Sequence, residues 1–243
     1  MIIALEGIDG AGKSTAALDL SVALKKRRID NVVIGSVSFA TYPPGGGETR
    51  RGPANQSNPQ PGWSRTVEGQ LRRMWEIRDE LEEQFGPQAF CLSNAWDFAH
   101  RWESLGAPAL ETGKVIIADR YIHTALVRDV LRGLDEDYVR TLYSFVPPPD
   151  LVIYVDTNPK VAYDRKIKNG LPIGYFEAGL DVTRRGAPLR LSFETFQSKC
   201  KKRYDKVLAG TPMVKIDGAR PAAEVHAEIL TTVLAHLEQS KRG

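Results

Sequence analysis

The residues whose types and spacing most clearly indicate a chemical function lie near the start of the chain. An apolar run at residues 2–5 leads into the motif Gly7-x-x-x-x-Gly12-Lys13-Ser14, and an apolar-periodic stretch follows it. This order predicts a strand, a glycine-rich loop and a helix, which is the context that a P-loop requires. Such a loop points backbone N–H groups at phosphate oxygens, and the helix dipole favours negative charge at the same place. We therefore predict that the chain binds a nucleoside triphosphate.

The residues of this motif have separate expected roles. We expect Lys13 to bridge the β- and γ-phosphates and the hydroxyl of Ser14 to ligate Mg²⁺. The alternative interpretation is a glycine-rich turn that carries a surface lysine. The loop residues predicted to bind the triphosphate are Gly7, Gly10, Ala11, Gly12, Lys13, Ser14 and Thr15.

Composition limits the class of protein. A chain of 243 residues with 42% hydrophobic residues is sufficient for one large α/β domain with insertions, or at most two small ones. A net charge of +3 gives no case for nucleic acid as the main partner. Cys91 and Cys200 lie far apart and lack metal-binding spacing, which is typical of thiols in a reducing compartment. No segment has the features of a signal peptide or a membrane span. We expect a cytoplasmic enzyme without a membrane partner.

Hydrophobic periodicity predicts five strands that alternate with helices. The predicted strands lie at residues 2–6, 32–37, 115–119, 151–156 and 213–217. The predicted helices lie at residues 16–26, 66–84, 90–105, 159–168, 192–208 and 222–237. This alternation favours a five-stranded parallel sheet with helices on both faces, in a single domain over residues 1–243. Two insertions interrupt that domain, a loop at about 45–65 and a lid at about 168–191.

A carboxylate and an arginine follow the third predicted strand. Asp119 ends that strand, and open α/β sheets bind ligands at the carboxyl ends of their strands. Asp119 is therefore a candidate for the Mg²⁺ or acceptor side of a site, although an aspartate there can also cap the next helix. Arg120 is placed to reach a second phosphate.

Two segments lack hydrophobic periodicity. Residues 170–191 hold Arg184, Arg185 and Arg190 among glycines and prolines, which is typical of a lid that closes over phosphates. The alternative is a solvated basic loop. Residues 50–63 form a long loop for which a functional lid and a poorly ordered segment both remain open.

Motifs along the whole chain resemble those of the thymidylate kinases. The segments that carry the resemblance are Glu6 to Thr15, Phe98 to Glu103, Asp119-Arg120-Tyr121, Tyr175-Phe176-Glu177, Ser192 to Tyr204, and Ile216 to Pro221. The resemblance implies a P-loop nucleoside monophosphate kinase that uses ATP and Mg²⁺, most simply to convert dTMP to dTDP. It also implies a homodimer.

The resemblance assigns roles to individual residues. The implied catalytic residues are Lys13, Asp9, Asp119 and Arg120 with a lid arginine, which is Arg184, Arg185 or Arg190. The implied acceptor-binding residues are Asp9, Tyr42, Phe98, Arg101, Arg120, Asp129 and Tyr175. Ser14 and Asp119 would serve the metal, and Arg220 lies in the loop near the adenine. In this family the catalytic arginine comes either from the P-loop, directly after the acidic residue, or from the lid. Because Gly10 follows Asp9 in this sequence, the resemblance implies that the lid provides the arginine.

The chain departs from the family pattern on the acceptor side. The turn at residues 42–46 holds no arginine for the acceptor phosphate, which leaves Arg50 or Arg51 for that role. Asp97 stands where an aromatic residue normally stacks on the base. Arg128-Asp129 stands where a polar amide often reads thymine, and an aspartate prefers an exocyclic amino group, as on cytosine. Both insertions are also longer than usual.

These departures leave three functional hypotheses open. The first is a thymidylate kinase. The second is a kinase of the same fold that acts on a modified pyrimidine nucleotide or another small acceptor. The third is a nucleotide-binding regulator that hydrolyses ATP without an acceptor, against which the Asp119-Arg120 pair and the arginine-bearing lid argue.

Overall fold

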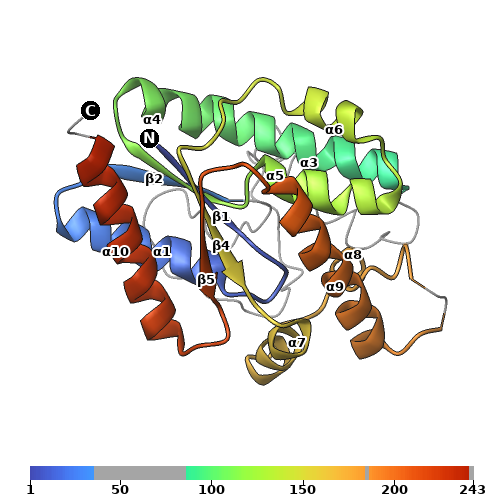
Figure 1. Cartoon of the computed structure of the whole chain (residues 1–243). Coiled ribbons are helices and arrows are strands. Elements are labelled where there is room, and N and C mark those ends of the chain that lie inside the picture. Colours follow the sequence, from blue (N-terminus) through green and yellow to red (C-terminus); the bar gives the residue numbers. More distant parts are fainter. Residues whose placement is uncertain (36–85, 184–185, 241–243) are drawn as a thin grey trace, which may run out of the picture.

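The computed structural model describes residues 1–35, 86–183 and 186–240 (Figure 1). Within these residues the centre is a parallel sheet with the strand order β2-β3-β1-β4-β5. The strands are β1 (Ile2–Glu6), β2 (Asn31–Gly35), β3 (Val115–Asp119), β4 (Leu151–Asp156) and β5 (Met213–Asp217). The predicted five-stranded parallel α/β architecture is therefore confirmed.

Helices cover both faces of this sheet. Before β3 lie α1 (Lys13–Lys26), α3 (Pro87–Arg101), the π-helical turn η4 (Trp102–Gly106) and α4 (Ala107–Glu111). Between β3 and β4 lie α5 (Ile122–Arg128), the 3₁₀ turn η5 (Val130–Arg132) and α6 (Glu136–Leu142). After β4 come α7 (Pro159–Lys168), α8 (Tyr175–Ala178), α9 (Leu189–Val207) and α10 (Ala222–Ser240). Figure 1 shows α1 and α10 together on one side, and α3, α5 and α9 on the other.

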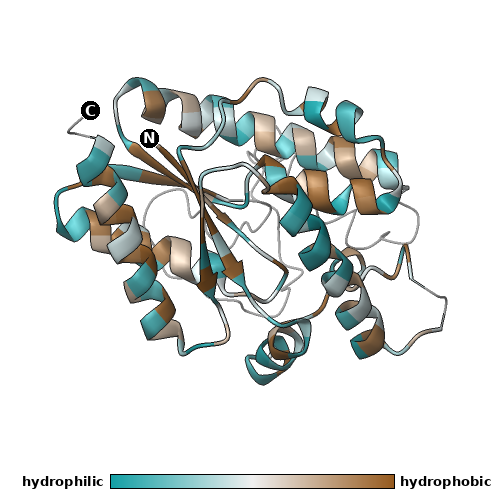
Figure 2. Cartoon of the chain, in the orientation of Figure 1, coloured by the Kyte–Doolittle hydropathy of each residue, from teal (hydrophilic) through white to brown (hydrophobic). Residues whose placement is uncertain are grey.

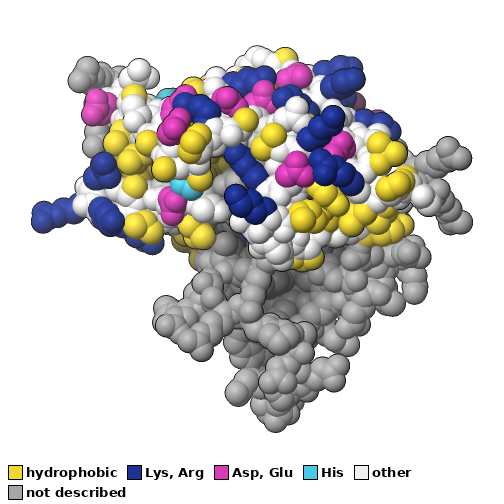
Figure 3. Space-filling view, turned by 90° about the horizontal axis from the view of Figure 1, so that it is seen from below, with side chains coloured by type: hydrophobic (Ala, Val, Ile, Leu, Met, Phe, Trp, Pro, Cys, Tyr) yellow, Lys and Arg dark blue, Asp and Glu magenta, His cyan; other side chains and the backbone are white. Residues whose placement is uncertain are grey.

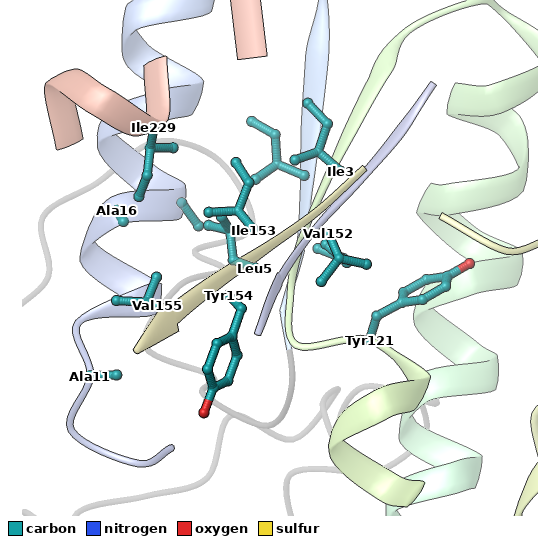
Figure 4. Close-up of a cluster of buried hydrophobic side chains, with 14 of the residues drawn as sticks. Ile3, Leu5, Ala11, Ala16, Tyr121, Val152, Ile153, Tyr154, Val155 and Ile229 are labelled. Carbon is teal, nitrogen blue, oxygen red and sulfur yellow. The ribbon is translucent and has the colours of Figure 1, made fainter. Parts of the chain in front are cut away.

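The core forms where the central strands meet these helices. Every residue of β1 is buried, as expected for a parallel strand covered on both faces, and Figure 2 shows the central strands in the hydrophobic colour. Successive residues of β4 point to opposite faces: Val155 lies toward Ala16 and Ile229, whereas Val152 lies on the side of Tyr121 (Figure 4). Each such buried aliphatic side chain contributes about 1.5–3 kcal/mol of transfer free energy.

The register of the sheet brings functional positions together. Leu5 of β1 pairs with Asp119 at the end of β3 and with Ile153 of β4. The carboxyl ends of the three central strands therefore lie at one edge, directly beside the loop that follows β1.

Some predicted elements differ from the observed ones. The helix predicted at 90–105 begins at Pro87 and changes to a π-helical turn at Trp102. Residues 170–191, predicted as irregular, contain α8, and α9 begins at Leu189 rather than Ser192. The turn after α8 is fixed by Gly179, whose φ is 65° and whose added Cβ would lie 2.4 Å from the Phe196 ring. The loop predicted at 50–63, the helix predicted at 66–84, and Tyr42 lie outside the described residues.

No helix in the described parts of the chain is both long enough and apolar enough to cross a lipid bilayer.

Candidate active site

The glycine-rich loop has the geometry of a phosphate cradle. It connects β1 to α1, and Gly12 at the helix start has a φ of 93°. Gly7 has a φ of 144°, and a Cβ there would lie 2.6 Å from the carbonyl oxygen of Val155. At Gly10 the φ is 78°, and a Cβ would lie 2.7 Å from the carbonyl oxygen of Ala162. Larger residues at these positions would push the loop away from β4 and α7, so the glycines hold the cradle in place.

A cavity of about 1310 Å³ opens at this loop. The loop and the first turn of α1 line its centre, residues 218–222 and the start of α10 line one part, and α3 and α5 line another. The C-terminal half of α7 and most of α8 complete the lining. Figure 3, seen from the side of α7, shows Lys and Arg side chains spread over this face with Asp and Glu side chains among them. The basic residues that line the cavity are Lys13, Arg120, Arg128, Arg165, Lys166, Lys168 and Arg220. The cavity is large enough for two nucleotides and has the charge to attract them.

Lys13 lies deep in the cavity wall. It is 4% exposed, and its Nζ donates a hydrogen bond of 2.6 Å to the carbonyl oxygen of Ile8. Burial and the nearby Arg120 lower the pKa of Lys13 to about 7. A polyanion that enters the cavity would favour the charged form and raise this pKa again.

Asp9 is the centre of a dense ionic cluster. Arg120 donates to Asp9 through Nη2 and to the carbonyl oxygen of Gly7 at 3.2 Å. Nη1 of Arg128 lies 3.4 Å from the other carboxylate oxygen. Gln197 donates to that same oxygen at 2.9 Å and accepts from the Asp9 N–H at 3.1 Å. Burial raises the pKa of Asp9, but the charges of Arg128 and Arg120 outweigh it and hold this pKa well below its usual range.

A buried hydrogen-bond network supports this cluster from beneath. The carboxylate of Glu6 accepts from the backbone N–H of Tyr121 at 2.9 Å, from Thr124 at 2.7 Å and from Tyr204 at 3.0 Å. The hydroxyl of Thr124 in turn accepts from Arg120 at 3.3 Å. Arg120 has a φ of 72°, a strained value for a residue with a side chain, so its position is fixed by these contacts.

Asp119 and Ser14 offer oxygen ligands of the kind that Mg²⁺ prefers. Asp119 is buried, and its Oδ1 has no hydrogen-bond partner among the described residues. Ser14 lies in the first turn of α1 and lines the cavity. The part of the chain that the structure describes holds no cluster of three or more His, Cys, Asp or Glu side chains that fits a metal. Ser14 lines the cavity and Asp119 does not, so the two residues fit Mg²⁺ by the type of their oxygen donors.

The predicted acceptor residues are only partly gathered at the cavity. Those that line it are Asp9, Phe98, Arg120, Asp129 and Tyr175. Arg101 is not part of the cavity lining; its Nε and Nη2 donate to Oδ1 of Asp97 at 3.1 and 2.9 Å, and Asp97 lines the cavity in its place.

The structure describes only one of the three predicted lid arginines. Arg184 and Arg185 lie outside the described residues. Arg190 lies at the start of α9, is not among the cavity-lining residues, and pairs with Asp164 at 3.1 Å and with Glu194 at 2.8 Å. Arg220 lines the cavity and pairs with Glu228.

Sequence reasoning missed several residues of the site. Arg165 of α7 donates to three successive carbonyl oxygens of the loop at residues 218–220. Lys166 pairs with Glu177 of α8 at 2.6 Å. The basic run at the end of α7 could have indicated both residues. Gln197 gave no signal, because it lies 188 positions from Asp9 in the chain.

Asp129 provides a test of the electrostatics in the part of the cavity lined by α3 and α5. Burial raises the pKa of its carboxyl to about 6, although Arg132 opposes the shift. In the unfolded chain the pKa is near 4, so the wild-type protein loses stability as the pH rises from about 4 to 6. Asparagine cannot ionise. We expect the free energy of unfolding of Asp129→Asn, relative to wild type, to rise by roughly 2 kcal/mol between pH 4 and pH 8. Urea unfolding at both pH values measures it, and a pH-independent difference contradicts the assignment.

Comparison with known proteins places this chain in a family. A sequence profile of the thymidylate kinases matches residues 64–229, more than half of the chain. The chain belongs to the thymidylate kinase family. It is therefore a nucleoside monophosphate kinase, in agreement with the P-loop, the parallel sheet and the ionic cluster around Asp9.

Members of the thymidylate kinase family match nearly the whole chain. A probable thymidylate kinase 2 of Saccharolobus solfataricus is 30% identical over 241 residues, which is 99% of this chain and 98% of the relative. The thymidylate kinase of Halothermothrix orenii is 28% identical over 94% of each chain. The thymidylate kinase of Geobacillus thermodenitrificans is 29% identical over 98% of this chain and 91% of its own.

Proposed function

We propose that the protein transfers the γ-phosphoryl group of ATP to dTMP and releases ADP and dTDP, with Mg²⁺ as cofactor. One observation carries this proposal: a single cavity holds both a phosphate cradle with Lys13 and a separate cationic centre formed by Arg120 beside Asp9. A hydrolase needs only the first of these, whereas a kinase needs an anion site for each substrate.

The residues of the site suit phosphoryl transfer. Two polyanions must meet in line, and positive charge around the transferring group lowers the barrier. Lys13 and Arg120 would contribute that charge from the cradle and the acceptor side. Mg²⁺ bound near Ser14 and Asp119 would neutralise charge on the β- and γ-phosphates. Asp9 would contact the acceptor sugar hydroxyl near the reacting phosphate.

The remaining roles are proposals of the same kind. Gly7, Gly10, Ala11, Gly12, Thr15 and Arg220 would bind ATP, and Tyr42, Phe98, Arg101, Asp129 and Tyr175 would bind the acceptor. Within one kinase domain over residues 1–243, the segment at about 168–191 would act as the lid and provide the catalytic arginine from Arg184, Arg185 or Arg190.

A homodimer in the cytoplasm is the state that we propose for this enzyme. Leu92 and Trp96 lie one turn apart on α3, and each is 45% exposed, which supports a covered face in solution. Cys91 and Cys200 are both free and buried, as is usual in a reducing compartment.

A second candidate acceptor is a cytosine nucleotide or another amino-bearing pyrimidine. Two carboxylates, Asp97 and Asp129, line the acceptor end of the cavity beside Phe98. The Oδ2 of Asp129 is buried and has no hydrogen-bond partner in the described parts of the structure. An exocyclic amino group would satisfy this oxygen, whereas a thymine carbonyl would not.

The experiment that separates these candidates is ADP release from ATP and Mg²⁺ against dTMP, dUMP, dCMP, CMP, UMP, AMP and GMP, with products identified by mass. The proposal predicts dTMP as the best acceptor and no turnover when EDTA is present. Preferred turnover of dCMP or CMP would support the second candidate and overturn the first.

Arg101 gives a prediction specific to the acceptor. The change Arg101→Ala removes the ion pair that orients Asp97, and it leaves the P-loop untouched. We expect the acceptor KM to rise by about tenfold, with little change in the KM for ATP, as for the loss of one charged hydrogen bond. Steady-state kinetics with each substrate varied in turn measure both constants. An effect confined to the KM for ATP would show that Arg101 belongs to the donor site.

A further inference from the structure

Arg128 occupies a central place in the cavity that the roles above do not use. It is the last residue of α5, one turn after Thr124, which contacts Arg120, and directly before Asp129. Its side chain is 16% exposed and lines the cavity. Along α5, Arg128 therefore stands between the cationic centre at Arg120 and the wall that faces the acceptor base.

The guanidinium of Arg128 is weakly bonded for a group so deeply buried. Its ion pair with Asp9 measures 3.4 Å, and Nη2 donates to the carbonyl oxygen of Phe176 at 3.3 Å. The Nε is buried and has no hydrogen-bond partner among the residues that the structure describes. Buried donors are normally satisfied, so a guanidinium with two long contacts and one orphaned N–H indicates a ligand that completes it.

Charge defines the class of that ligand. Asp9 is shared between Arg120 and Arg128, while Lys166 is neutralised by its own partner, Glu177. Neither guanidinium has the carboxylate of Asp9 to itself, and the long contacts of Arg128 leave it able to donate to an added acceptor. A nucleobase or a sugar hydroxyl is uncharged, whereas a phosphate monoester carries about −1.5 to −2 charge near pH 7 and has oxygens that could accept hydrogen bonds from both arginines.

We propose that Arg128 binds the phosphate of the acceptor nucleotide, together with Arg120. Arg128 is then a residue that selects a phosphorylated acceptor over the free nucleoside. This inference rests on the proposed function, because it requires a nucleoside monophosphate as the acceptor. It assigns Arg128 to the phosphate and leaves only Asp129 of the Arg128-Asp129 pair to face the base.

The test compares affinities for phosphorylated and unphosphorylated acceptors. The binding of dTMP, dUMP, dCMP and CMP is measured by titration calorimetry, and that of the matching nucleosides by their inhibition of turnover. The proteins are wild type, Arg128→Met, Arg128→Lys and the control Arg203→Met. Arg203 is 20% exposed and pairs with Glu136 outside the cavity lining, so it matches Arg128 in burial and pairing.

The expected result is selective for the phosphate. Arg128→Met should lower the affinity for each monophosphate by about 10- to 100-fold, which is the loss expected for a charge-assisted hydrogen bond. The affinity for each nucleoside should change by less than about twofold. Arg128→Lys should restore part of the loss, because it keeps the charge but not the planar fork. The KM for ATP should stay unchanged, and Arg203→Met should behave as wild type.

Other outcomes would overturn the inference. Equal losses for monophosphates and nucleosides would mean that Arg128 only orders the site through Asp9 and Phe176. A loss of affinity confined to ATP would place Arg128 on the donor side. Unchanged affinities would show that Arg128 does not bind the phosphate of the acceptor. If wild type bound none of the four monophosphates, the proposed function would fail first and this inference with it. Thermal unfolding of each variant establishes that all are folded.

Discussion

Replacing Lys13 with methionine should lower the turnover number by about 100- to 1000-fold while the protein remains folded. The P-loop motif is expected to bring the ammonium of Lys13 to the transferring phosphoryl group, and methionine keeps the aliphatic stem but not the charge. Because Lys13 is 4% exposed, its removal relieves a desolvation cost and should not reduce stability. Single-turnover kinetics and thermal unfolding measure the two effects separately.

A control for the loss of a lysine charge outside the cavity exists on the last strand. Lys215 pairs with Asp156 at 2.9 Å and lies outside the cavity lining, so Lys215→Met should turn over as wild type does. Wild-type rates in Lys13→Met would contradict the P-loop assignment.

Lys13 also predicts a pH dependence of ATP binding. Its pKa in the free protein is about 7, because burial and Arg120 disfavour the charged form, and a bound triphosphate would raise that pKa. Binding of ATP should therefore take up a proton between about pH 7 and pH 9, and affinity should fall as the pH rises through this range. Calorimetry in buffers of different ionisation enthalpy measures the uptake, which should disappear in Lys13→Met.

Arg120→Met should have the second large effect, a fall of about 100-fold or more in kcat/KM for the acceptor. Arg120 joins the P-loop carbonyl of Gly7, the carboxylate of Asp9 and the hydroxyl of Thr124, and it is held at a strained backbone conformation. Methionine removes the donors at the point where we propose that the two substrates meet. Steady-state kinetics with the acceptor varied measure the loss.

The control for this change is again Arg203→Met, which should leave kcat/KM unaltered. A loss in Arg120→Met that appears only as a lower melting temperature, with normal kcat/KM in the folded fraction, would show that Arg120 holds the structure rather than the substrates.

The sequence predicted most of the sheet because each buried parallel strand is a short, uninterrupted apolar run. The run at residues 115–119 and the run at 151–156 coincide with β3 and β4, and the loop at Gly7 follows β1 as expected. The sequence did not predict helix α5, because its β-branched residues and the aromatic residue before it do not give a clear helical period of apolar positions. Here the tertiary contacts of Thr124 and its neighbours decide the local structure.

The candidate site was less predictable because long-range contacts build it. Gln197 reaches Asp9 from a helix at the other end of the chain, and no local pattern indicates that contact. The resemblance directed attention to Arg101 as a residue that contacts the base, but the structure turns Arg101 onto Asp97. The sequence places the pair Arg128-Asp129 where a polar amide often reads thymine, whereas the contact between Arg128 and Asp9 is visible only in three dimensions.

The most direct test of the central claim is the fate of the γ-phosphoryl group. The protein is incubated with [γ-³²P]ATP, Mg²⁺ and dTMP, and the labelled products are separated. We expect the label to appear in dTDP, with little in inorganic phosphate and none in dTDP when dTMP is omitted. Label that appears only in inorganic phosphate, or no transfer from a folded sample, would contradict the claim that this cavity joins a phosphoryl donor to a nucleoside monophosphate acceptor.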